Sequence, residues 1–150
     1  IFMSIISMCC NRNAMSQRTS SNEYVLETHH QKIWIPSKLE ETYEHKAKDT
    51  LKKVLDLAFE QAFDDSVYIK VNDSIVYKKR IKTDPKLSVV KDDFIIDYSV
   101  YKDIPSISIF LVEKKKFIRF KPALGYRHVY LSGLQESWEL NFSNYPRFYY

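Results

Sequence analysis

The residue best placed for acid–base chemistry is His128. An unperturbed imidazole titrates close to neutral pH, so it can move a proton or bind a metal. His128 follows Arg127 and lies between Tyr126 and Tyr130. Alternate side chains of a strand share a face, so an ordinary amphipathic strand explains this spacing. The sequence therefore favours a structural role for His128.

Catalysis by His128 would require a carboxylate partner in a concave site. If the protein were a hydrolase, we would expect a pocket in which His128 meets Asp97 or Glu139. A flat, fully packed sheet at His128 would exclude this hypothesis.

Other chemical motifs are absent from the sequence. His29 and His30 are adjacent, so they would point to opposite sides of a strand and not share a ligand. The chain has two glycines, which argues against a glycine-rich phosphate loop, and its cysteines are confined to Cys9 and Cys10. No nucleophile elbow or HExxH pattern is present. We therefore expect a protein that is not an enzyme and has no metal or cofactor.

The chain ends in an aromatic segment, SNYPRFYY. Tyr145, Phe148 and Tyr149 surround Arg147, and such a group can stack on a sugar or anchor a protein partner. The alternative is a last strand whose aromatic side chains close the core.

A second candidate surface is the lysine turn Lys114, Lys115 and Lys116, close to Arg119 and Lys121. It could contact anionic headgroups or acidic glycans, or it could be a solvated turn. The formal net charge is +4 and the isoelectric point about 8.9, but no nucleic-acid-binding motif accompanies this charge. We expect no nucleic-acid partner.

The first eight residues, IFMSIISM, are uncharged and too few to span a bilayer, which takes about 20 residues. With the cysteines that follow, they resemble the end of a bacterial lipoprotein signal peptide. Ile6, Ser7 and Cys9 fit the cleavage pattern, whereas Met8 stands where that family has a small residue. The resemblance implies a lipid anchor on Cys9, with Cys10 as the alternative.

The following segment, NRNAMSQRTSSNE, is polar and has no helical or strand period, which predicts a flexible tether. We expect residues 1–9 to end a signal peptide, residues 10–22 to form the tether and residues 23–150 to form one domain. This order predicts a protein of the cell envelope, anchored in a membrane and facing the periplasm or the cell surface. The alternatives are an ordinary cleaved signal, or a cytoplasmic protein whose first residues pack on the domain.

The segment from Pro36 onward predicts one long amphipathic helix over about residues 37–63. Ser37 and Glu40 form a capping box. Apolar residues recur at helical spacing: they are Leu39, Tyr43, Ala47, Leu51, Val54, Leu55, Ala58 and Ala62.

From Val67 the period changes to two, which predicts seven or eight short strands over about residues 67–150. Val67 to Ile81 has the pattern of a hairpin turning at Asn72 and Asp73, and the lysine turn predicts a second hairpin. The connections between these predicted strands are too short for the crossovers that parallel neighbouring strands require. EYVL and KIWI, ahead of the helix, could add an edge strand. The expected class is therefore α+β, an antiparallel β-sandwich with the helix packed on it.

The stretches YIKVNDSIVYKKRIKTD, KKKFIRFKPALGYRHVYL and NYPRFYY resemble small bacterial β-sandwich lipoproteins of unknown function. The resemblance implies an extracytoplasmic binding role and transfers no active-site residues. The resulting hypothesis is a non-enzymatic, membrane-tethered protein that binds a protein or a glycan. The alternatives are a soluble immunity-type protein that occludes a toxin, which an adjacent toxin gene would favour, and a hydrolase using His128.

Overall fold

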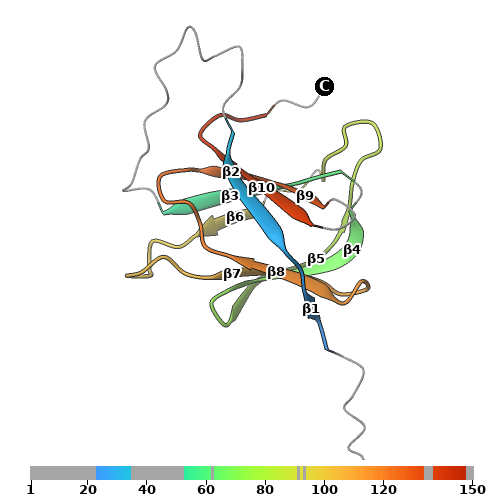
Figure 1. Cartoon of the computed structure of the whole chain (residues 1–150), viewed down its shortest axis with the longest axis horizontal. Helices are drawn as coiled ribbons and strands as arrows, with labels where there is room; N and C mark the ends of the chain where they lie inside the picture. Colours follow the sequence, from blue (N-terminus) through green and yellow to red (C-terminus); the bar gives the residue numbers. More distant parts are fainter. Residues whose placement is uncertain are drawn as a thin grey trace, which may run out of the picture.

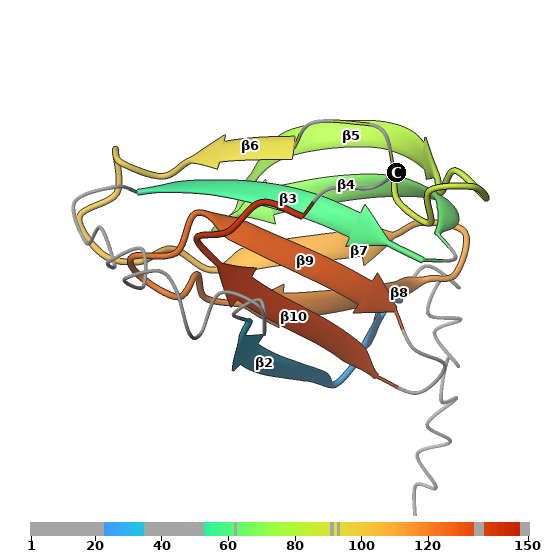
Figure 2. The same cartoon turned by 90° about the horizontal axis from the view of Figure 1, so that it is seen from above.

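A computed structural model describes residues 23–34, 53–61, 63–90, 92, 94–133 and 137–147. They form two five-stranded sheets that stack face to face as a β-sandwich (Figures 1 and 2). Sheet A has the order β1 (Val25–Leu26), β8 (Lys116–Phe120), β7 (Ile107–Leu111), β4 (Asp64–Val71) and β5 (Ser74–Lys82). Sheet B has the order β2 (His29–Ile33), β10 (Trp138–Ser143), β9 (His128–Gly133), β3 (Val54–Glu60) and β6 (Phe94–Asp97).

The predicted α+β class is wrong, because the described residues contain no helix. The end of the predicted helix is strand β3, which pairs with β6 on one side and β9 on the other. Leu55, Leu57 and Phe59 of this strand point into the core and are at most 1% exposed. The earlier part of the predicted helix, residues 37–52, lies outside the described residues.

The predicted antiparallel topology is also wrong, because both sheets are mixed. Strand β3 pairs in parallel with β9, from Asp56 opposite His128 to Glu60 opposite Ser132. Strands β1 and β2 pair in parallel with β8 and β10. Five other strands lie between β3 and β9 in the sequence, so these two strands are not joined by a short connection and can pair in parallel.

Both predicted hairpins are present. Strands β4 and β5 are antiparallel and turn at Asn72, whose φ of 52° lies in the left-handed region that Asn tolerates. Strands β7 and β8 are antiparallel and turn through the lysine segment, where Lys115 has the same φ.

The core lies between the sheets and is one cluster to which both contribute. Its largest fully buried side chains include Trp138, Phe59 and Phe142 from sheet B and Ile69, Ile107 and Ile118 from sheet A. Inward apolar residues alternate with outward polar ones on most strands, so each sheet buries one face.

The N-terminal ribbon, residues 23–34, closes one side of the sandwich by pairing with an edge of each sheet (Figure 1). Glu27 lies where the ribbon passes from sheet A to sheet B. Its carboxylate accepts a hydrogen bond from Lys116 Nζ at 2.6 Å and another from Trp138 Nε1 at 2.7 Å. In addition to the backbone pairing, one acidic side chain therefore connects the ribbon to both β8 and β10.

The other side of the sandwich is closed by Tyr77 of β5. Its hydroxyl donates to the carbonyl of Ile95 at 3.0 Å and accepts from the amide of the same residue at 3.2 Å. Because Ile95 lies on β6, this side chain connects the edge of sheet A to the edge of sheet B.

Candidate binding pocket

The outer face of sheet B carries a pocket of about 410 Å³. Its floor consists of Asp56 and Ala58 from β3 and His128 and Tyr130 from β9. These residues point outward because they alternate with core residues such as Leu57. The parallel register places Asp56 beside His128 and Ala58 beside Tyr130.

One wall of the pocket is the segment that leads from β5 to β6. It runs along the end of β3, where the Val90 amide donates to the Phe59 carbonyl at 2.9 Å and the Gln61 amide donates to the Ser88 carbonyl at 2.7 Å. Residues 84–89 of this segment form turns and isolated bridges. The pocket residues that it supplies are Leu87, Val89, Val90 and Asp92.

The opposite wall is the segment after β10, residues 144–147, which supplies Pro146 and Arg147. Asn144 fixes this segment to the loop before β9. Its Oδ1 accepts from the Arg127 amide at 2.9 Å, and its Nδ2 donates to the Gly125 carbonyl at 2.9 Å.

The hydroxyl of Tyr130 holds this second wall against the sheet. It donates to the carbonyl of Tyr145 and accepts from the amide of Arg147, both at 2.8 Å. Burial raises the pKa of Tyr130 to about 12, so the hydroxyl keeps its proton at neutral pH.

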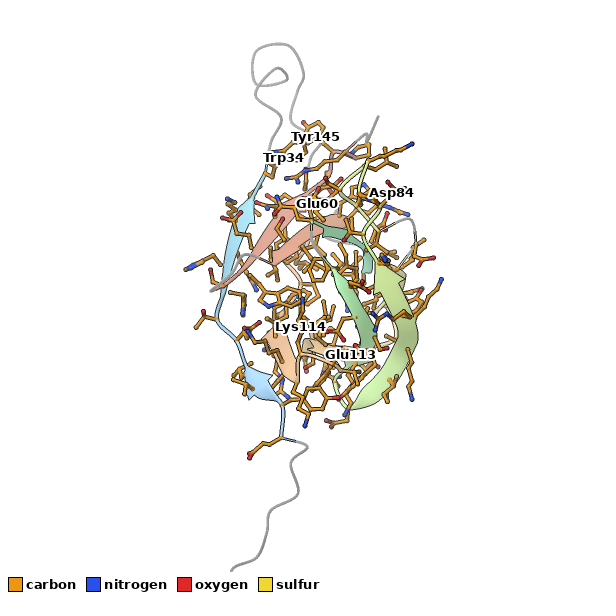
Figure 3. The ribbon with its side chains drawn as sticks, turned by 90° about the vertical axis from the view of Figure 1, so that its right-hand side faces the viewer. Trp34, Glu60, Asp84, Glu113, Lys114 and Tyr145 are labelled. Carbon is orange, nitrogen blue, oxygen red and sulfur yellow. The ribbon has the colours of Figure 1, made fainter. Side chains whose placement is uncertain are left out.

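The side chain of Arg147 is held on three sides. Its guanidinium lies 4.3 Å from the ring centroids of both Trp34 and Tyr130, and it forms an ion pair with Glu60 at 2.5 Å. Figure 3 shows Trp34, Tyr145 and Glu60 gathered at this end of the molecule. Arg147 is therefore a fixed part of the wall and not a mobile cation.

The principal polar contact within the pocket joins His128 to Asp56. The His128 Nδ1 lies 3.4 Å from the Asp56 Oδ2. Asp92 also lines the pocket and forms an ion pair with Lys79 at 2.6 Å. The site thus presents carboxylate oxygens and an imidazole beside an apolar wall.

The carboxylate partner of His128 is neither of those predicted. Asp97 lies on β6, where its carboxylate accepts a hydrogen bond from the Ser99 amide at 2.9 Å. Glu139 lies on β10 and forms an ion pair with Lys32 at 3.1 Å. Asp56 was missed because the predicted helix assigned it to a different element.

The predicted aromatic surface is described in part. Tyr145 and Arg147 lie beside the pocket, whereas Phe148 and Tyr149 are outside the described residues, as are Cys9 and Cys10. The structure adds Trp34 and Glu60 to this end of the molecule.

The predicted lysine turn lies far from the pocket, as the positions of Lys114 and Tyr145 in Figure 3 show. Contacts of this turn join it to β1 and β4. Lys116 forms an ion pair with Glu27 at 2.6 Å, and the Lys114 amide donates to the carboxylate of Asp65 at 3.2 Å.

Within the part of the chain that the structure describes, no helix is long and apolar enough to cross a membrane. The same residues contain no group of three or more side chains suited to hold a metal ion.

Comparison with known proteins gave no relative. No family model matches the chain, and neither a curated protein nor a solved structure matches it.

Proposed function

We propose that this protein is a non-enzymatic binding protein of the cell envelope, tethered to a membrane through Cys9 or Cys10, and that it binds a glycan in the pocket on sheet B. The observation that carries the proposal is the Asp56–His128 pair beside an apolar wall. Sugars present the matching chemistry, because their hydroxyl groups lie next to apolar C–H faces.

The volume of the pocket supports a small ligand. Its volume falls within the range of about 300–1,000 Å³ that is usual for ligand pockets. Leu87 is the partly exposed apolar residue of the first wall, with the largely buried Val89 and Val90 behind it, and Asp56 and Asp92 supply acceptors for hydroxyl groups. The cations Arg147 and Lys79 are each paired with a carboxylate, which favours a polar, uncharged ligand over a strongly anionic one.

The test is a glycan array probed with the full chain, followed by affinity measurements on each glycan that binds. Asp56→Asn removes a charged acceptor, and a hydrogen bond to a charged group contributes roughly 1.5–3 kcal/mol. We expect the variant to bind about ten- to a hundredfold more weakly. Asp73→Asn, in the exposed turn between β4 and β5, is the matched control and should bind as the parent chain does.

Two results would contradict the proposal. One is a chain that is folded and binds no glycan on the array. The other is a glycan whose affinity is equal for the parent chain and Asp56→Asn.

The second candidate function is hydrolysis, which the contact between His128 and Asp56 favours. Ser143 lies opposite His128 on β10, but it is fully buried and its Oγ accepts a hydrogen bond from the Tyr145 amide at 3.0 Å. Since Ser143 is enclosed, the histidine would have to activate a water molecule. The test is turnover of chromogenic esters or glycosides by the parent chain. If the parent chain turns one over and His128→Gln does not, the result would support hydrolysis over binding alone.

The proposed tether has a separate test. Expression of the complete reading frame in a bacterial host should yield a membrane-bound protein whose intact mass includes acyl chains on a cysteine. An unmodified protein in the cytosol would contradict the proposed tether. The glycan-binding proposal would not be affected, because the array experiment tests it separately.

A further inference from the structure

The outer face of sheet A carries a stripe of aromatic side chains across three neighbouring strands. Tyr68 of β4 stacks on Phe110 of β7 with ring centroids 4.4 Å apart, and Phe110 stacks on Phe117 of β8 at 4.8 Å. The interplanar angles are 10° and 7°, so the three rings are nearly parallel and stacked face to face. Both faces of Phe110 are covered by the neighbouring rings and it is only 9% exposed, whereas Tyr68 and Phe117 are partly exposed.

Further apolar residues extend this stripe. Leu26 of β1 is in register with Phe117 and is 61% exposed. Tyr24 contacts Tyr68 and Phe110 edge to face, with centroid distances of 5.9 and 5.2 Å. The N-terminal ribbon therefore begins on the outer face of sheet A.

Cations flank the stripe. Lys70 Nζ lies 5.5 Å from the Phe110 centroid, and the Arg119 guanidinium lies 5.7 Å from that of Phe117. Lys78 is in register with Tyr68 and is exposed. Ile75, opposite Lys70 on β5, is 57% exposed.

The acidic side chains next to this face do not balance these cations. Asp64 and Glu113 both pair with Arg80, at 2.5 and 2.6 Å, and Asp64 also lies 3.7 Å from Lys82. The positive charge of Lys70, Lys78 and Arg119 therefore remains in surplus around an apolar stripe.

We propose that this outer face of sheet A docks on an anionic lipid membrane. The exposed Leu26 and Ile75 and the partly exposed Tyr68 and Phe117 would enter the headgroup region. The flanking lysine and arginine side chains would attract anionic headgroups.

Single-stranded nucleic acid fits less well, because bases stack on open ring faces. Here Phe110 is enclosed between two rings, and Lys70 and Arg119 lie over the rings of Tyr68 and Phe117.

The proposal rests neither on the glycan pocket nor on a lipid anchor. The pocket is on the outer face of sheet B, on the opposite side of the sandwich, so a membrane-docked molecule would present it away from the lipid. Loss of one function by mutation should leave the other intact.

The experiment uses the full chain with Cys9→Ser and Cys10→Ser, so that no acyl chain contributes to binding. It is sedimented with vesicles of phosphatidylcholine alone or mixed with phosphatidylglycerol. We expect binding only to the anionic vesicles, weakening as salt is raised. Lys70→Gln with Lys78→Gln should weaken binding about five-fold per lysine removed.

The control is Lys86→Gln with Lys102→Gln, which removes the same charge from exposed loops outside sheet A and should bind nearly as the parent does. Leu26→Ser tests the apolar part without disturbing the core, and it should also weaken binding. Failure of the parent chain to sediment with anionic vesicles would overturn the proposal, as would equal losses in the two lysine double variants. Binding of a single-stranded oligonucleotide but not of vesicles would overturn it too.

Discussion

At the scale of single residues, Asp65 is the most deeply enclosed acidic side chain described. It is 0% exposed, and its two carboxylate oxygens accept hydrogen bonds from the amides of Glu113 and Lys114 at 2.9 and 3.2 Å. This side chain ties the start of β4 to the turn between β7 and β8. Burial of a carboxylate is costly unless its oxygens are hydrogen bonded, and here they are.

We predict that Asp65→Ala lowers the free energy of unfolding by about 1–3 kcal/mol, because it leaves two amides of a tight turn without their acceptor. Urea denaturation of the full chain measures this change. Asp73→Ala, in an exposed turn, should change stability by less than about 0.5 kcal/mol. Equal effects of the two substitutions would show that the carboxylate of Asp65 does not hold the turn.

The lowered pKa of His29 predicts that the stability of the fold depends on pH. Burial lowers the pKa of His29 below its ordinary value of 6.5, and the neighbouring His30 lowers it further. The unfolded chain then binds the proton more readily than the folded chain does. Stability should therefore fall as pH falls through about 6.5 and level off below the pKa of the folded state.

The measurement is the thermal midpoint of the parent chain and of His29→Gln across this pH range. The difference between the two chains isolates the contribution of His29 and is the informative quantity. A difference that does not vary with pH would contradict the prediction.

The candidate site could be predicted only in part at this scale. The sequence indicated His128 as the imidazole best placed for chemistry, and His128 does line the pocket. Its partner Asp56 is 72 positions away in the numbering and becomes its neighbour only through the parallel pairing of β3 with β9. The sequence pattern of a single segment cannot reveal this register, because the register depends on how two distant strands pair.

At the scale of elements, the predicted helix shows that apolar residues at helical spacing can also occur in a segment that forms a strand. The helical stripe included Val54, Leu55 and Ala58 but left Leu57 and Phe59 on the polar side. A period of two explains the same segment better, with Leu55, Leu57 and Phe59 inside and Asp56 and Ala58 outside. The hairpins were predictable because their turns and alternation are local, whereas β3 depends on partners distant in the sequence.

We predict that Glu27→Gln loosens the N-terminal ribbon. The carboxylate accepts from both Lys116 and Trp138, and the amide would leave the Lys116 ammonium without its counter-charge. Hydrogen exchange at the amides of β2 should become faster, and the free energy of unfolding should fall by about 1–3 kcal/mol. Glu23→Gln, an exposed residue of the same ribbon, is the control. Unchanged protection of β2 would refute the role of Glu27.

At the scale of the whole molecule, the two sheets share one core, so they should unfold together. Leu57 is 1% exposed, and truncation of a buried leucine costs about 2–5 kcal/mol. We predict that Leu57→Ala shifts the near-ultraviolet and far-ultraviolet circular dichroism transitions equally. Val100→Ala, at an 85% exposed position, should shift neither. Separate transitions for the two signals would indicate that the sheets unfold independently.

The N-terminal ribbon also determines how the molecule would respond to mechanical force. Backbone hydrogen bonds join Val25 to Lys115 just before β8, Glu27 to Phe117 of β8, and Thr28 and Trp34 to β10. Tension on Glu23 along the ribbon axis would load these bonds in shear, all at once, and not one after another as in the peeling of a hairpin. A domain pulled from its N-terminal side would therefore resist as a unit, because the strand that bears the load is clamped to both sheets.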